Sequence, residues 1–175
     1  SSSENHWEGK TWYAYGTSIT NTTNEGRYAT YLAKLGGFVH VNKGISGGGI
    51  CSNKNIKNAI MNITDGKLNA DLITLEVTAN DGSCDWGTIY DSEDTDTFCG
   101  NLTACIKYLQ ENTNAQIVVL SSPVMIETTM NSNVWTPPEY KNPSNGLTRY
   151  DKNRLVEDVC RLHCVYYIPL GECGG

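Results

Sequence analysis

Three short polar segments contain the residue types that acyl transfer requires. Ser18 offers a hydroxyl nucleophile, the glycines around Gly47 offer unobstructed backbone N–H groups, and Asn80 offers a carboxamide donor. A nucleophile combined with two such donors would supply an attacking group and an oxyanion hole. The three segments are residues 16–20, 44–49 and 78–82.

Each of these segments follows a predicted strand, and strand and helix patterns alternate along the whole chain. Nearly continuous apolar strands separated by helices are typical of a parallel sheet covered on both faces, which predicts a three-layer α/β/α sandwich in a single domain, residues 1–175. Ligands of such sheets bind beyond the carboxyl ends of the strands, so we expect Ser18, Gly47 and Asn80 to converge there. The predicted strands are 11–15, 38–41, 71–77, 117–120 and 165–168, and the predicted helices are 28–35, 56–63, 102–109 and 154–162.

The three segments, in this order and at these distances, resemble the first three conserved blocks of the SGNH (GDSL) hydrolases. By that resemblance Ser18 is the nucleophile, Gly47 the backbone oxyanion donor and Asn80 the side-chain oxyanion donor. The resemblance covers essentially the whole chain and implies a flavodoxin-like, five-stranded parallel sheet of order 2-1-3-4-5. It also implies a cofactor-free hydrolase of O-acyl esters, with acetylated carbohydrate as the favoured substrate.

The sequence departs from the family pattern at two places. The family has Asp before the serine, whereas this chain has Thr17, a position that mainly supports the turn. The family's last block, Asp-x-x-His after the fifth strand, has no counterpart, since the printed sequence ends at residues 171–175 and the domain is expected to be truncated there. His6, His40 and His163 are predicted to lie before the first strand, within the second, and at the amino end of the fifth. Because none of them can act as the base, we expect the 175 residues alone to hydrolyse esters barely above background.

Other interpretations of these motifs stay open. The same fold could serve as a non-catalytic binding or structural domain, or as a lipid or thioester hydrolase. Residues 44–49 suggest a dinucleotide or phosphate loop, but they match neither G-x-G-x-x-G nor a Walker motif. Glu76, Asp81 and Asp85 suggest a carboxylate pair for glycoside hydrolysis, although acidic loop residues are usually just solvated. A serine at a helix start is also a common N-cap, so the ordered set of motifs carries the argument rather than any one of them.

Composition limits the possible partners. The net charge of −6 and the absence of a basic run disfavour nucleic acid and leave a small-molecule or carbohydrate ester as the expected ligand. No apolar run approaches the ~20 residues of a membrane helix. Residues 1–4 lack the pattern of a signal peptide, yet the cysteine content favours an extracellular protein. The oligomeric state is not predicted.

Seven cysteines suggest at least one disulfide. Cys84 and Cys99 flank a loop-like segment, and we hypothesise that they form a disulfide bond. Cys105 and Cys160 fall on apolar helix faces and are predicted to be buried free thiols. Three glycosylation sequons would matter only in a host that glycosylates secreted proteins, and they lie at Asn21, Asn62 and Asn101.

The segment from Ser121 to Gly146 is too long for a minimal α/β connection. Its aromatic residues could form a rim over a ligand cleft, or the segment could be a surface loop packed by those same aromatics. The segment carries Trp135, Pro137, Pro138 and Tyr140, of which Trp135 and Tyr140 are the aromatic residues.

Overall fold

The structure is a computed structural model that describes residues 4–21, 27–63, 69–122 and 139–170. Strands and helices alternate along the chain in the predicted order. The strands are β1 (Thr11–Gly16), β2 (Val39–Gly44), β3 (Leu72–Val77), β4 (Gln116–Ser121) and β5 (Tyr166–Pro169). The helices are α1 (Ser18–Asn21), α2 (Tyr28–Gly36), α3 (Asn55–Met61), α4 (Phe98–Asn112) and α5 (Arg149–Leu162).

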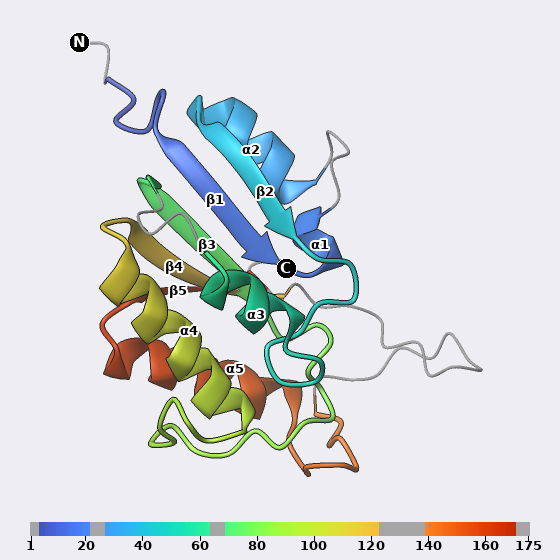
Figure 1. Cartoon of the computed structure of the whole chain (residues 1–175). Coiled ribbons are helices and arrows are strands. Elements are labelled where there is room, and N and C mark those ends of the chain that lie inside the picture. The colour runs from blue at the N-terminus through green and yellow to red at the C-terminus, as the bar shows by residue number, and fades with distance from the viewer. Residues whose placement is uncertain (1–3, 22–26, 64–68, 123–138, 171–175) are drawn as a thin grey trace.

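All five strands form one parallel sheet in the order β2-β1-β3-β4-β5, which confirms the predicted topology (Figure 1). β1 therefore lies between β2 and β3, and Gly16 at its carboxyl end pairs with Gly44 of β2. The turns that follow these three strands consequently lie side by side, beyond the carboxyl ends of the strands.

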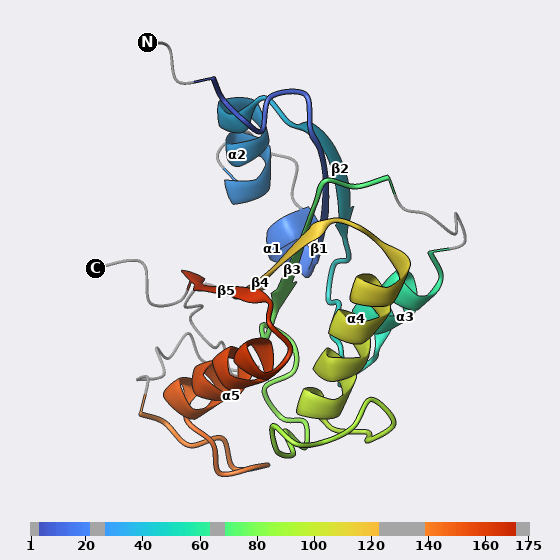
Figure 2. The same cartoon turned by 90° about the vertical axis from the view of Figure 1, so that its left-hand side faces the viewer.

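The two faces of the sheet are covered by different helices (Figure 2). On one face α2 packs against β1, with Ala29 and Ala33 contacting Trp12 and Ala14. The larger core lies on the other face, where α3, α4 and α5 pack against β1, β3 and β4. Trp86 and Phe98 extend this core, since their rings stack with centroids 3.7 Å apart. The arrangement is the predicted three-layer sandwich.

Helix starts differ from the predictions because capping residues, not the apolar stripe, determine them. α4 begins four residues earlier than predicted, at Phe98, because the Thr97 side chain accepts a hydrogen bond from the Gly100 N–H. α5 begins at Arg149, after a reciprocal capping box between Thr148 and Asp151. None of the described helices is long and apolar enough to cross a bilayer.

The structure does not contain the hypothesised disulfide between Cys84 and Cys99, since both are free thiols and Cys99 is buried in the core. Cys99 points into the core from α4 and is 1% exposed, whereas Cys84 lies half-buried in the turn after β3. Cys105 and Cys160 are buried free thiols, as predicted. The sequon at Asn101 is buried within α4, where its side-chain amide donates to the Asp96 carboxyl and the Thr97 carbonyl, so a glycan cannot be attached there in the folded chain.

Candidate active site

The turns that follow β1, β2 and β3 meet beyond the carboxyl ends of these strands, a region called here the carboxyl edge of the sheet. Ser18 begins α1 two residues after the end of β1, which is the middle strand of the three. The Ile45 N–H donates to the Gly16 carbonyl at 2.8 Å and joins the first turn to the second. The Asn80 side-chain amide donates to the Gly48 carbonyl at 2.9 Å and joins the third turn to the second. The three sequence-predicted segments are thus brought together.

A buried carboxyl group of β3 holds the turn that carries Ser18. Glu76 is 0% exposed and accepts hydrogen bonds from the Thr17 N–H at 3.0 Å and the Thr17 hydroxyl at 2.7 Å. Its carboxyl also accepts from the hydroxyls of Thr20 and Ser122. The Thr20 hydroxyl is in turn bonded to the Tyr28 hydroxyl, whose pKa is raised chiefly by burial. Glu76 therefore links α1, α2 and the end of β4 to one point beneath the turn.

Thr17 supports the turn in the way expected of that position. The residue is fully buried, and besides donating to Glu76 its hydroxyl accepts from the Ile19 N–H at 3.2 Å. Thr17 is thus held by a carboxyl group of the neighbouring strand β3. Ser18 itself is partly buried at the start of the short helix.

A second buried carboxyl group, Asp81, holds the glycine-rich turn. Its two oxygens accept from three consecutive backbone N–H groups, those of Ile50, Cys51 and Ser52, at 3.1, 3.0 and 2.8 Å. Gly47 lies just before this bend with φ +70° and is exposed, and a side chain there would meet no atom within 4 Å. The backbone at Gly47 is therefore open for a ligand to approach.

The burial of Glu76 and Asp81 overturns the expectation that these acids are solvated. Both carboxyl groups are at most 1% exposed and are saturated with hydrogen bonds, so neither can protonate a glycosidic oxygen or activate water. Asp85 is exposed and accepts from the Gly87 N–H. Sequence reasoning missed the structural roles of Glu76 and Asp81. The available signal was a single charged residue, Glu76, inside an otherwise apolar strand.

All three histidines lie away from this edge. His40 of β2 pairs with Trp12 of β1, and the centroids of their rings lie 4.7 Å apart. Trp12 lies four residues before Gly16 at the end of β1, which is roughly 13 Å along the strand. His163 caps the carboxyl end of α5 and lies 3.4 Å from the Thr103 hydroxyl, before β5 begins. His6 precedes β1 and contacts Trp7. Burial lowers the pKa of both His40 and His163, which favours their neutral forms.

A loop from the carboxyl-terminal half packs beside the turn that carries Asn80. The Asn145 side-chain amide donates to the carbonyls of Gly82 and Cys84 at 2.8 and 2.9 Å. The indole N–H of Trp86 donates to the Asp81 carbonyl at 3.0 Å. Of the predicted aromatic rim, Tyr140 is exposed, and the other members lie outside the described residues: Trp135, Pro137 and Pro138.

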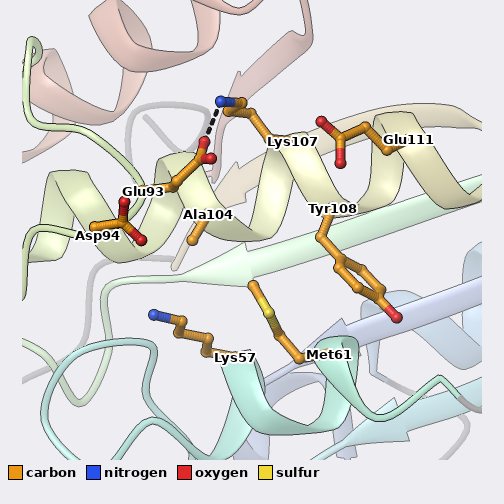
Figure 3. A pocket seen from close by; sticks show the side chains of 8 residues that line it. All are labelled: Lys57, Met61, Glu93, Asp94, Ala104, Lys107, Tyr108 and Glu111. Carbon is orange, nitrogen blue, oxygen red and sulfur yellow. Dashed lines mark ion pairs between the residues drawn. The ribbon is translucent and has the colours of Figure 1, made fainter.

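A cavity of about 280 Å³ lies elsewhere, between α3 and α4 (Figure 3). Charged side chains line its mouth, and Lys107 forms an ion pair with Glu93. Neither Ser18, Gly47 nor Asn80 contributes to this cavity, so it is separate from the candidate site. Among the described residues, no three His, Cys, Asp or Glu side chains gather as a metal site would require.

Solved structures with this fold include esterases. A protein from Lactobacillus plantarum aligns with a TM-score of 0.73 at 23% identity, covering 97% of this chain and 81% of its own. A carbohydrate acetylesterase family member from Sinorhizobium meliloti aligns with a TM-score of 0.61 at 15% identity, covering 93% and 83%. A catalytic mutant of Axe2, an acetylxylan esterase from Geobacillus stearothermophilus, gives a TM-score of 0.59 at 17% identity, covering 92% and 76%.

AlinE4, an SGNH-hydrolase family esterase, also shares the fold, with a TM-score of 0.58 at 14% identity over 92% of this chain and 76% of its own. No family model and no curated protein sequence matches the chain. By fold, then, the chain is an α/β protein with the architecture of SGNH-hydrolase esterases.

Proposed function

We propose that this chain is an ester hydrolase of the SGNH type, acting on O-acyl esters through Ser18. The observation that carries the proposal is the convergence of the three turns, above all the hydrogen bond from Asn80 to Gly48 between the second and third turns. The esterases among the proteins of the same fold support it.

In the proposed reaction the Ser18 hydroxyl attacks the ester carbonyl carbon while its proton passes to a base. The developing oxyanion accepts hydrogen bonds from the backbone N–H groups of Ser18 and Gly47 and from the Asn80 amide. The Asn80 amide has two N–H bonds, and the one not directed at the Gly48 carbonyl is available for this purpose. The alcohol leaves with a proton, and water then releases the acid from the acyl-serine.

The proton acceptor is the part of this reaction for which the described residues place no imidazole at the carboxyl ends of the strands. An imidazole must lie about 3 Å from the serine hydroxyl to take its proton. His40 lies near the amino end of β2, and His163 lies at the carboxyl end of α5. Catalysis at esterase rates therefore requires a base from an Asp-x-x-His segment or from outside the chain.

Acetylated carbohydrate is the proposed substrate class. A carbohydrate acetylesterase family member and an acetylxylan esterase share the fold, and the net charge of −6 suits a neutral ligand better than an anionic one. A lipid or thioester substrate on the same scaffold is the alternative that a substrate comparison would distinguish.

The test compares hydrolysis of p-nitrophenyl acetate and acetylated xylo-oligosaccharide by two forms of the protein. The 175 residues alone should act barely above background, whereas a form carrying an Asp-x-x-His segment after Gly175 should be faster by several orders of magnitude. Ser18→Ala should abolish the gain, and Ser92→Ala, which changes an exposed serine in a distant loop, should leave it intact. An extended form that is inert toward every ester would reject the esterase proposal.

A binding domain is the second candidate, and the position of the histidines favours it. A domain that keeps the three converging turns but lacks a base would bind the ester without cleaving it. Calorimetry with acetylated xylo-oligosaccharide would then show binding that Ser18→Ala leaves unchanged, together with no product from the extended form.

A further inference from the structure

Two cysteines lie on neighbouring turns of the carboxyl edge. Cys51 follows the glycine-rich turn after β2, and Cys84 lies in the turn after β3. Both residues are half-buried and both carry free thiols. They are separated by a strand and a helix in the sequence but by very little in space.

The contacts of Asp81 and Asp85 show how near the two sulfurs are. One oxygen of Asp81 accepts from the Cys51 N–H at 3.0 Å and from the Cys84 thiol at 3.9 Å. The Cys51 thiol donates to the carbonyl of Asp85, the residue after Cys84, at 3.9 Å. Each thiol also affects the pKa of the other, as two groups close in space do.

The other described cysteines are placed differently. Cys99, Cys105 and Cys160 are buried among core side chains, and Cys164 is exposed next to the amino end of β5. Cys51 and Cys84 are therefore a pair of partly exposed thiols that share Asp81 as a neighbour.

We propose that Cys51 and Cys84 form a disulfide bond under oxidising conditions, which ties the glycine-rich turn to the turn that carries Asn80. The pair replaces the earlier hypothesis of a bond between Cys84 and Cys99. The crosslink is independent of whether the chain hydrolyses esters.

The reaction is a thiol–disulfide exchange with a small disulfide such as oxidised glutathione. The Cys51 thiolate attacks one glutathione sulfur, forms a mixed disulfide and releases the first glutathione thiol. Cys84 then loses its proton and attacks the Cys51 sulfur, which releases the second. Two protein thiols are oxidised and one glutathione disulfide is reduced to two thiols.

Cys51 is the attacking residue because it ionises first. Burial, together with the neighbouring Cys51 and Asp81, raises the pKa of Cys84 to about 12. Burial also raises the pKa of Cys51. Since only the thiolate reacts, bond formation is slow at neutral pH and accelerates as the pH rises.

The experiment incubates the folded 175-residue protein with mixtures of oxidised and reduced glutathione at neutral and alkaline pH. Non-reducing digestion and mass spectrometry should recover a crosslinked peptide pair containing Cys51 and Cys84. The oxidised protein should unfold at a temperature roughly 5–10 °C higher than the reduced protein, because closing this loop restricts the unfolded chain.

Variants distinguish the bond from unselective oxidation. Cys84→Ser should stop the reaction at a glutathione adduct on Cys51, whereas Cys99→Ser, which alters a buried thiol, should leave the crosslink intact. Melting curves of both reduced variants verify that they are folded. Recovery of Cys51 and Cys84 as free thiols after Cys164 has been fully modified would overturn the proposal, as would a dominant crosslink between Cys84 and Cys99.

Discussion

The two turns that meet beside Ser18 are each built over a buried carboxyl group, but the partners of the two groups differ in kind. Glu76 beneath the serine turn is bonded mainly by hydroxyls, those of Thr17, Thr20 and Ser122. Asp81 beneath the glycine-rich turn is bonded by three backbone N–H groups.

The difference matters because hydroxyls can reverse their role and backbone amides cannot. A hydroxyl rotates to accept a hydrogen bond when its partner becomes a donor, whereas a backbone N–H can only donate. The glycine-rich turn should therefore depend more strongly on its carboxylate than the serine turn does. The following predictions test that comparison.

Replacing Asp81 with asparagine should have the largest effect. One carboxyl oxygen becomes an NH2 group, which faces a backbone donor such as the Ile50 N–H and leaves it unsatisfied in a buried place. We expect the free energy of unfolding to fall by about 3 kcal/mol. Urea denaturation measures it, and Asp85→Asn, at an exposed aspartate, is the matched control with a loss below about 0.5 kcal/mol. Equal losses in the two variants would show that Asp81 does not organise the turn.

Gly44→Ala should have the second-largest effect on stability, because Gly44 lies where the two turns touch. A methyl group there would come within 2.6 Å of the Asn21 Cα atom and 2.8 Å of the Thr20 carbonyl carbon, and backbone atoms cannot move aside cheaply. We expect a loss of about 2–3 kcal/mol in thermal or urea unfolding. Gly47→Ala provides the comparison, since that site is open and only its positive φ opposes a side chain, at a cost of about 1 kcal/mol. The reverse order would mean that α1 does not pack against Gly44 as described.

Glu76→Gln should lower the free energy of unfolding by about 1 kcal/mol, which is less than the loss expected for Asp81→Asn. The Gln oxygen can still accept from the Thr17 N–H and the Thr20 hydroxyl, which share one carboxyl oxygen of Glu76. The hydroxyls of Ser122 and Thr17, which face the other oxygen, can turn to accept from the new amide. The two variants are best unfolded side by side in urea. A loss for Glu76→Gln as large as that for Asp81→Asn would contradict the argument from hydroxyl reversal.

The smallest effect concerns His40, far from both turns. Burial lowers the pKa of His40 below its ordinary value of 6.5, so the unfolded chain takes up the proton first as the pH falls. The contribution of His40 to stability should be constant above about pH 6.5 and should decline below it, down to the pKa of the folded state. Unfolding in urea near pH 7.5 and pH 5.5 should show a weaker pH dependence for His40→Gln than for the parent. An unchanged dependence would assign the acid sensitivity to other groups, with His163→Gln as the next variant to measure.

Much of the fold could be predicted because the apolar patterns of its strands and helices are local in the sequence and can be recognised without knowledge of tertiary contacts. The apolar run of β3 and the helical repeat of α3 are local features, and their alternation determines the layers. Capping is also local, and the Thr148 to Asp151 box could have placed the start of α5 correctly. The start of α4 was encoded in the same local way, by the Thr97 cap directly before Phe98.

The candidate site was predictable as a set of segments, but its supports were not. The order of Ser18, Gly47 and Asn80 could be taken from the sequence because each follows a strand. The bond between Asp81 and the backbone of residues 50–52 joins segments about 30 positions apart, and no local pattern encodes it. The disulfide hypothesis failed for the same reason. Flanking a loop says nothing about the direction in which Cys99 points.

The position of β1 between β2 and β3 has a consequence for biosynthesis. β1 emerges first, yet one of its edges stays unpaired until β3 has been synthesised about 60 residues later. In that interval a largely apolar strand presents free backbone donors and acceptors to other nascent chains. β4 and β5 then each add to an edge that already exists, so the sheet grows outward in chain order. Aggregation on the ribosome should accordingly depend on translation speed between residues 45 and 71, and slow codons placed there should lower the soluble yield more than slow codons placed after β4.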